Sequence, residues 1–234
     1  MKKRSKPKKR LVVLSLGGSI IVPNKIDVDF LKKFRKLIIS RIKLKKEKFI
    51  IVCGGGRLAR DYINAAKKLG CRNDIEEDRI GIKATNLNSE LLMVMFGKHA
   101  HKEVALDYRK NVKFNGVLIC SGLVPGTSSD YDSIMFALTN RAKSVINLSN
   151  IRYVYSKDPR KFKNARRIED MTWNEYHKII GGRFKAGMNV PFDQLAAKKA
   201  KQKRMNVAIM DGRDLKNLGR FLDGKKFRGT IIHS

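Results

Sequence analysis

The chain has 234 residues, of which 42% are hydrophobic, and 52 Lys and Arg residues stand against 21 Asp and Glu residues. This length and apolar fraction are enough to fill one sizeable core, which excludes a disordered chain and a small disulfide-stapled protein. The longest apolar runs, Phe49–Cys53 and Leu91–Phe96, are far shorter than a bilayer span, so no transmembrane helix is expected.

The net charge of +31 is the most unusual property of the composition. A field of this sign attracts polyanions, meaning nucleic acid, nucleotides or an anionic membrane surface. Seven of the first ten residues are Lys or Arg and none is acidic, which predicts a flexible basic tail over residues 1–10 and one folded domain over residues 11–234. Most of the surplus lies beyond the tail, where a solvated basic surface explains it as well as a polyanion-binding surface does.

The three cysteines, Cys53, Cys71 and Cys120, form no C-x-x-C pair, so they predict neither a zinc site nor a disulfide framework. Scattered thiols are typical of the reducing cytosol, and we therefore expect a cytoplasmic location. The basic start followed by apolar residues 11–22 imitates a secretory signal, but glycines and Pro23 interrupt that stretch and no cleavage site follows.

Short apolar runs rich in β-branched residues alternate with helical patterns along the whole chain. The predicted strands are Leu11–Leu16, Phe49–Cys53, Val117–Cys120, Ser144–Leu148, Val207–Met210 and Thr230–His233. The predicted helices are Phe30–Ile42 after an Asp27 cap, Arg57–Leu69 ending at Gly70, Ile75–Phe96, Asp130–Asn140, Tyr176–Ile180 after a capping box at Thr172–Glu175, and Pro191–Lys203 with proline in its first turn. This alternation predicts an α/β fold with a mostly parallel central sheet and helices on both faces.

In such a fold, ligands bind at the carboxyl ends of strands, in the loops that lead into helices. Three of these loops, 17–19, 54–60 and 122–130, are rich in glycine or hydroxyl residues. Glycine lets the backbone approach a phosphate, and helix N-termini present N–H groups to an anion. Together the loops predict a phosphate-binding site. Because a Cβ would collide with phosphate oxygens there, Gly56→Val is expected to abolish nucleotide binding and leave the fold intact.

Two other phosphate-binding motifs explain less. The Walker A pattern G-x-x-x-x-G-K-[ST] is absent, which excludes an ordinary P-loop kinase. Residues 54–59 match the dinucleotide pattern G-x-G-x-x-A, with acids such as Asp74 about twenty residues later. That match follows the second strand, not the first, and leaves the other two loops unexplained.

Six short motifs follow one another along the chain. They are S-L-G-G-S at 15–19, C-G-G-G-R-L-A-R at 53–60, D-x-x-G-x-x-x-T-x-x-N at 78–88, P-G-T-S-S-D at 125–130, S-N at 149–150 with Y-x-x-D-P at 155–159, and V-P-F-D at 190–193 with A-A-K at 196–198. The set resembles the amino acid kinase superfamily and is similar to its UMP (uridylate) kinases of the archaeal-like branch. This resemblance covers residues 11–234 and implies an amino acid kinase-like fold.

The resemblance implies a UMP kinase of pyrimidine biosynthesis that transfers the γ-phosphate of ATP to UMP to give UDP. Residues 11–143 would form the acceptor-binding half, and residues 144–234 the ATP-binding half. Magnesium would bind through the ATP phosphates and keep most of its waters, so no protein metal site is expected. The resemblance further implies a homo-oligomer, specifically a hexamer.

The resemblance also implies a role for individual residues. ATP would contact Gly18, Ser19, Gly56, Arg60, Ser149, Asn150, Tyr155 and Asp158. UMP would contact Gly55, Asp78, Leu123, Val124, Pro125, Gly126, Thr127, Ser128 and Ser129. Asp78 would accept hydrogen bonds from the ribose, and the loop 123–129 would surround the uracil and the α-phosphate. Asp130 and Asp193 are the expected catalytic carboxylates.

Two departures from the family pattern leave questions open. Ser15 stands where many members have a lysine, so Arg60 or Lys198 would have to supply the neutralising cation. Arg152 and Tyr153 replace the Asp and Gly of the usual N-V-D-G-V-Y segment, which leaves the preference for a nucleotide base open.

Two alternative functions remain from the sequence. One is another member of the superfamily that phosphorylates a carboxylate, a carbamate or an isoprenoid phosphate; residues 127–129, three hydroxyls before a helix, favour a phosphorylated acceptor instead. The other is a non-catalytic nucleic-acid-binding protein on this scaffold, which rests on charge alone because RNA-recognition aromatics are missing. We expect only weak, sequence-independent nucleic-acid binding, largely through Met1–Arg10, and no membrane partner.

Overall fold

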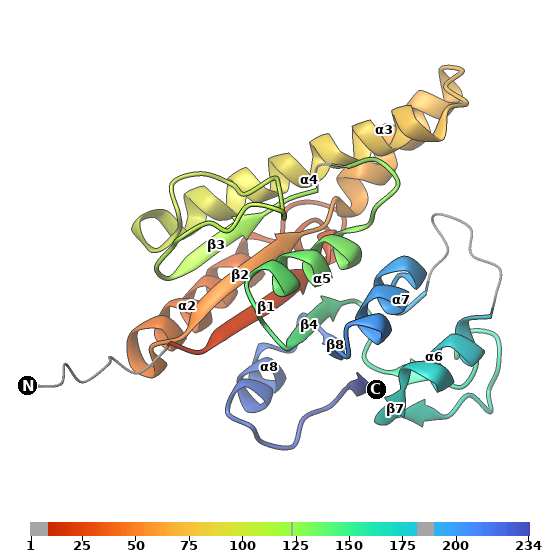
Figure 1. Cartoon of the computed structure of the whole chain (residues 1–234). Coiled ribbons are helices and arrows are strands. Elements are labelled where there is room, and N and C mark those ends of the chain that lie inside the picture. The colour runs from red at the N-terminus through yellow and green to blue at the C-terminus, as the bar shows by residue number, and fades with distance from the viewer. Residues whose placement is uncertain (1–8, 123, 182–189) are drawn as a thin grey trace, which may run out of the picture.

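Strand sequences from both ends of the chain meet in one central sheet. The computed structural model describes residues 9–122, 124–181 and 190–234. The strands of this sheet are β1 Leu11–Leu16, β2 Lys48–Cys53, β3 Val117–Cys120, β4 Ser144–Ser149, β7 Asp170–Thr172, β8 Asn206–Asp211 and β9 Thr230–His233. Their spatial order is β3-β2-β1-β4-β8-β9-β7 (Figure 1). A separate antiparallel pair consists of β5 Val154–Tyr155 and β6 Arg167–Ile168.

Most neighbouring strands are parallel, which confirms the predicted sheet. Strand β1 pairs in parallel with β2 and β4, so Leu14 lies opposite Ile51 on one side and Ile146 on the other. The exception is β9, which runs antiparallel to β8, while β7 runs parallel to β9. The last two strands of the sheet therefore point against the others. The sequence does not predict β5, β6 and β7, because runs of two or three residues are too short to show a period.

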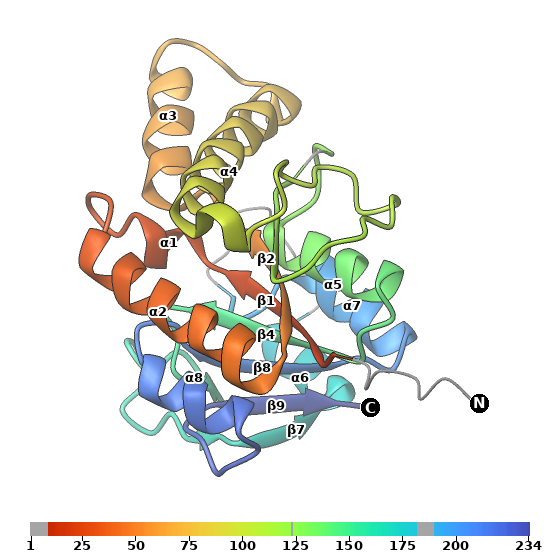
Figure 2. The same cartoon turned by 90° about the vertical axis from the view of Figure 1, so that its left-hand side faces the viewer.

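Helices cover both faces of the sheet, as predicted. Their bounds are α1 Gly18–Ile21, α2 Val28–Lys45, α3 Gly56–Lys68, α4 Asp74–Phe96, α5 Ser129–Thr139, α6 Trp173–Ile180, α7 Gln194–Gln202 and α8 Leu215–Leu222, with the short 3-10 helix η1 Gly97–His99. Helices α2, α4 and α8 contribute buried side chains to one face, and α5, α6 and α7 to the other. Helices α3 and α4 form an arm that projects beyond the sheet (Figures 1 and 2). Within the described ranges no helix is both long and apolar enough to cross a membrane.

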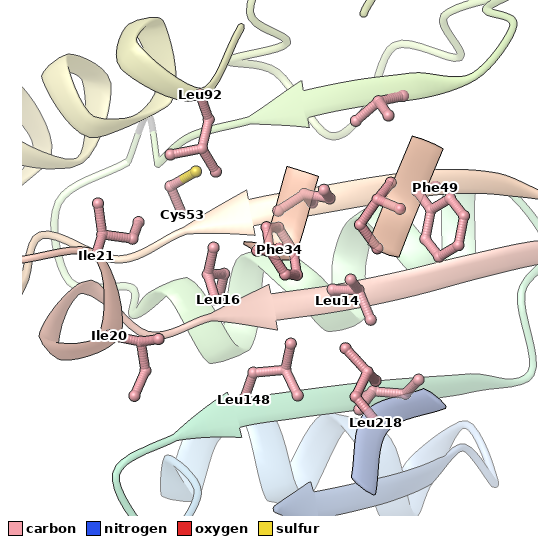
Figure 3. Close-up of a cluster of buried hydrophobic side chains, with 14 of the residues drawn as sticks. Leu14, Leu16, Ile20, Ile21, Phe34, Phe49, Cys53, Leu92, Leu148 and Leu218 are labelled. Atoms are coloured by element: carbon pink, nitrogen blue, oxygen red, sulfur yellow. The ribbon is translucent and has the colours of Figure 1, made fainter. Parts of the chain in front are cut away.

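The core lies on both sides of the sheet because successive strand residues point to opposite faces. Leu14 and Leu16 of β1 belong to one buried cluster, whereas Val13 between them belongs to the other. Figure 3 shows Leu14 and Leu16 in the first cluster with Leu148 of β4 and Phe34 of α2. Burial of both faces explains why the strands read as unbroken apolar runs.

Two predicted helix starts are confirmed, and two α-helices, α1 and α8, were not predicted. The Asp27 side chain accepts the Phe30 N–H at 3.0 Å at the start of α2. The capping box at Thr172–Glu175 is present at the start of α6. Helix α8 is absent from the sequence prediction because Gly219 interrupts its pattern, although Leu218 and Leu222 are buried one turn apart.

Two other helix starts differ from the prediction and bear on the site. Helix α7 begins at Gln194, and Pro191 precedes it, because Asp193 is the cap and its side chain accepts the Ala196 N–H at 2.8 Å. Helix α5 is capped by the Ser128 hydroxyl. Asp130 is therefore the second helical residue, and its carboxylate makes other contacts.

Candidate functional site

The first two glycine loops lie in direct contact at the carboxyl ends of β1 and β2. The Gly17 N–H donates to the Leu148 carbonyl at 2.8 Å, and the Gly54 N–H donates to the end of β1 at 2.9 Å. Gly18 and Gly56 then lie back to back, since a Cβ built on Gly18 would be 2.0 Å from the Gly56 nitrogen. The predicted convergence of these loops is confirmed.

Gly56 is required by the fold itself, which corrects one expectation. Its φ is +64°, and a Cβ there would lie 2.2 Å from the Gly18 carbonyl oxygen. A side chain at this position thus meets backbone before it meets any ligand. The expectation that Gly56→Val leaves the fold intact is wrong.

A cavity of about 190 Å³ opens between α4 and the starts of α3 and α5. Six of the residues that the sequence predicts for the site line it, namely Gly55, Gly56, Asp78, Thr127, Ser128 and Ser129. The N-terminal ends of α3 and α5 both face this cavity. We call it the acceptor cavity.

Asp78 is hydrogen-bonded to the loop that borders the acceptor cavity. Its Oδ2 accepts the Gly126 N–H at 2.6 Å, and the Thr127 hydroxyl donates to the Val124 carbonyl at 2.8 Å. Asp78 therefore holds the loop after β3 to α4, a contact that the sequence does not reveal. Leu123, the first predicted UMP contact in this loop, lies outside the described residues.

The D-x-x-G-x-x-x-T-x-x-N motif places one face of α4 along the acceptor cavity. The Asn88 amide donates to the Gly54 carbonyl at 2.8 Å, which fixes the second glycine loop. The Thr85 hydroxyl lies 2.9 Å from the Ser121 hydroxyl at the end of β3. The sequence analysis gives this motif but assigns only Asp78 of it to the site. The helical spacing of Gly81, Thr85 and Asn88 places them on the same face of α4, and this spacing could have identified them as site residues.

Asp130 lies where β1, β4 and the start of α7 meet. Its Oδ1 accepts the Ser15 hydroxyl at 3.0 Å and the Asn147 amide at 3.1 Å, and its Oδ2 accepts the Asp193 N–H at 3.2 Å. Burial raises the pKa of Asp130 to about 6, and the bonds from Asp193 and Ser15 oppose that shift. The carboxylate thus titrates close to neutral pH.

Two further acids lie at the starts of α7 and α5. Asp193 is the N-cap of α7, and burial raises its pKa. Asp132 lines the acceptor cavity and is only 2% exposed. The Thr127 hydroxyl oxygen lies 3.4 Å from the Asp132 Oδ1, a long contact because that hydroxyl donates to the Val124 carbonyl. Burial raises the pKa of Asp132 to about 7. The sequence does not single out Asp132, because acids are common in the first turn of a helix.

A second, larger cavity of about 640 Å³ lies beyond β4 and β8. The predicted residues Asn150, Tyr155 and Asp158 line it, together with the two unusual residues Arg152 and Tyr153. We call it the donor cavity.

Aromatic and charged side chains pack against each other at this second cavity. The Tyr153 and Tyr155 rings meet edge to face, and the Arg167 guanidinium lies 5.5 Å from the Tyr153 ring centroid. Asp158 pairs with Arg160 two residues later, which holds the pKa of Asp158 below its usual range. Tyr153, the departure from the family glycine, is buried.

The remaining predicted residues line neither cavity within the described ranges. They are Gly18, Ser19, Arg60, Val124, Pro125, Gly126, Asp130, Ser149 and Asp193. Arg57 is bonded to Asp61 and Asn24, whereas Arg60 is an exposed residue of α3. In the described part of the chain, no three His, Cys, Asp or Glu side chains gather closely enough to hold a metal ion.

Comparison with known proteins identifies the family. The model of the amino acid kinase family matches residues 10–211. The chain belongs to this family. It is 30% identical over 227 residues to a uridylate kinase of Methanobrevibacter smithii, covering 94% of this chain and 98% of the relative. It is 32% identical over 225 residues to a uridylate kinase of Thermococcus onnurineus, with the same coverage.

Solved structures of the amino acid kinase family agree with the fold. The crystal structure of uridylate kinase from Archaeoglobus fulgidus matches with a TM-score of 0.80 and 32% identity, covering 94% of this chain and 99% of that one. The UMP kinase of Bacillus anthracis matches with a TM-score of 0.77 at 21% identity, which supports the fold alone. Membership of the family confirms the resemblance drawn from the six motifs.

Proposed function

We propose that this amino acid kinase family member is a nucleoside monophosphate kinase that transfers the γ-phosphoryl group of ATP to UMP and forms UDP. The observation that supports it most directly is the acceptor cavity, where Gly55 and Gly56 face the hydroxyls of 127–129 across two helix N-termini. Hydroxyls and helix N-termini suit a phosphorylated acceptor. Relatives named uridylate kinase, matched over 94% of the chain, support UMP as that acceptor.

We place UMP in the acceptor cavity and ATP in the donor cavity, with residues 11–143 forming the acceptor half and 144–234 the ATP half. Asp130 then lies between the substrates. It follows Ser129, which lines the acceptor cavity, and it accepts the N–H of Asp193, two residues after Pro191 of the donor cavity. Only the pairing of β1 with β4 joins the two halves of the sheet, and Asp130 is bonded to both strands.

The transfer needs positioning and charge neutralisation from the protein more than covalent chemistry, because charge spreads over the moving phosphoryl group. Magnesium on the ATP phosphates would supply part of that neutralisation. The half-buried carboxylates of Asp130 and Asp193 suit a role in holding the ion's water shell. With Ser15 in place of the family lysine, we assign the neutralising cation at the phosphates to Arg60 or Lys198.

A coupled assay of ADP formation with ATP, magnesium and one acceptor at a time tests the proposal. UMP is expected to be phosphorylated in preference to CMP and AMP. Turnover of a carbamate or an isoprenoid phosphate without turnover of UMP would indicate another branch of the family. Absence of turnover with every acceptor would favour a non-catalytic protein.

We also propose that the protein is a homo-oligomer assembled through the projecting arm. Helix α3 has no buried residue in the single chain, and the side chains of Tyr62 and Leu69 are 64% and 88% exposed. The family resemblance favours a hexamer. Light scattering after gel filtration checks the mass, and Tyr62→Asp is expected to lower it.

A further inference from the structure

Helix α2 presents a row of cations along its outer side. Lys32, Arg35, Lys36 and Lys43 recur at helical spacing, Lys46 follows at the left-handed C-cap of the helix, and all five are exposed. We call these five residues the α2 stripe. The apolar side of the helix, with Phe34 and Ile38, packs into the core on the opposite side of α2. No acidic residue occurs between Lys32 and Lys46.

The α2 stripe lowers the stability of the helix, and a surface that is merely exposed to solvent gains nothing in return. Lys32 repels Lys36 one turn away, and like charges at this spacing destabilise a helix. Within the described ranges, none of the five side chains forms a salt bridge. Surfaces that serve solubility alone intersperse both signs of charge. The stripe is therefore better explained by an anionic partner.

Two arginines outside the α2 stripe have acidic partners, which the stripe residues lack in the part of the chain that the structure describes. Arg41, on the inner side of α2, is bonded to Glu47 at 2.8 Å and also to Asp223 of the α8 end. On the projecting arm, Arg57 pairs with Asp61 at 3.1 Å.

The positive field continues from α2 onto the neighbouring elements. The Arg35 guanidinium donates to the Met95 carbonyl at 2.6 Å, which ties the stripe to the end of α4. Burial first, and then the charges of Lys43, Lys98 and Arg35, lower the pKa of His99 in η1. Figure 2 shows α2 lying across one face of the sheet with α8 beside it. Lys43, Lys98 and Arg35 therefore lie close enough to His99 to act on its charge beside α2.

We propose that the α2 stripe is a docking site for the phosphate backbone of RNA. From Lys32 to Lys43 the row extends about 16 Å along the helix, and Lys46 lies just beyond the helix end. This length is enough to meet several successive phosphates of one strand. A mononucleotide is too short to bridge it. Membrane-binding helices insert an apolar side, but that side of α2 is already buried in the core.

Two triple variants with equal changes of charge test the site. Lys32→Gln, Lys36→Gln and Lys43→Gln neutralise the stripe in the full chain. Lys178→Gln, Lys201→Gln and Lys203→Gln, made together, neutralise three exposed lysines of the α6 and α7 layer on the other face. The probe is a single-stranded RNA of mixed sequence and about 20 nucleotides without terminal phosphates. Its backbone is long enough for the phosphate contacts that the row offers. Fluorescence anisotropy gives its affinity over a series of salt concentrations.

The stripe variant is expected to bind this RNA at least about tenfold more weakly and to lower the slope of log K against log salt by about 2, since each single-strand phosphate contact contributes about 0.7. The control triple should lose less than about twofold. Replacing the same three stripe lysines by arginine should preserve binding. Turnover of ATP and UMP, measured in parallel, should remain that of the wild type in all variants and so verify the fold.

Three results would overturn the proposal. Equal losses in the two glutamine triples would mean that binding reflects net charge and no particular surface. Unchanged binding by the stripe variant would assign RNA to another part of the chain, such as the tail. Stripe-dependent binding to vesicles of phosphatidylcholine and phosphatidylserine in equal parts, without stripe-dependent RNA binding, would make the partner a membrane.

Discussion

The contacts of Asp130 allow its charge to be removed with little change of shape. In Asp130→Asn, the backbone N–H of Asp193 can only donate, so the new amide oxygen must take the Oδ2 position. The new NH₂ group then faces the Ser15 hydroxyl and the Asn147 side chain, both of which can turn to accept it. The substitution therefore keeps the hydrogen bonds and removes the negative charge.

Stability and turnover should respond to Asp130→Asn in different directions. The pKa of Asp130 is raised to about 6, so the native state binds this proton more tightly than the unfolded state does. The associated stability is fully present below about pH 4 and is lost as the pH rises to about 6. Asn does not ionise, and it avoids a cost of up to about 3 kcal/mol at pH 8. Turnover should nevertheless fall at least about tenfold, or ~1.4 kcal/mol of barrier.

The assay compares turnover on UMP and ATP with the melting temperature at pH values from about 5 to about 8, a range that includes the raised pKa of Asp130. Wild-type turnover should rise as Asp130 ionises, whereas Asp130→Asn should be slow at every pH and melt no lower at the alkaline end. Asp27→Asn, at the α2 cap, is the control and should change neither property, because Asn caps about as well as Asp. Asp193→Asn should reduce turnover less. Wild-type turnover in the Asp130 variant would refute the catalytic assignment.

Three further predictions concern the neighbouring residues. Gly56→Val should lose more than about 2 kcal/mol of stability in urea unfolding, because its Cβ meets the Gly18 backbone at positive φ. The control is Gly219→Ala, which has open space around it and should gain about 0.5–1 kcal/mol of stability. Equal stabilities of the Gly56→Val and Gly219→Ala variants would contradict the packing of the two glycine loops. Asp78→Ala should raise the KM for UMP more than that for ATP in steady-state kinetics, since Asp78 holds the acceptor loop, and equal effects would count against it. Asp132→Asn should raise the free energy of unfolding by up to roughly 4 kcal/mol at pH 8 and by little at about pH 4. The reason is that the stability tied to protonation of Asp132 is lost between about pH 4 and pH 7. An effect of the same size at every pH would exclude titration of Asp132 as the cause.

The fold follows largely from local patterns in the sequence. Leu11–Leu16 and Thr230–His233 were predicted with the bounds that they have, because strands buried on both faces read as apolar runs. The order of the strands required tertiary structure, since no periodicity states that β1 lies between β2 and β4. Helix α7 begins three residues later than predicted, because the Asp193 cap outweighs the preference of Pro191 for a first turn.

The site was predictable where several residues act through one loop, and not where a single side chain reaches a distant element. Gly55, Gly56 and the hydroxyls of 127–129 follow strand ends and meet at one cavity. The Asp78 bond to the acceptor loop spans 48 residues, and no sequence pattern encodes such a contact. Asp132 is hidden for another reason, because an acid in the first turn of a helix is ordinarily a solvated partner of the dipole.

The reversed direction of β9 has a practical consequence for handling the protein. The site loops leave the carboxyl ends of β1, β2, β3 and β4, whereas β9 runs against β8 and ends at the opposite edge of the sheet. Leu11, where β1 starts, lies at that same far edge. A fluorophore, an affinity tag or a surface anchor joined after Ser234 would therefore lie away from the site loops, and protein immobilised there should turn over like protein in free solution.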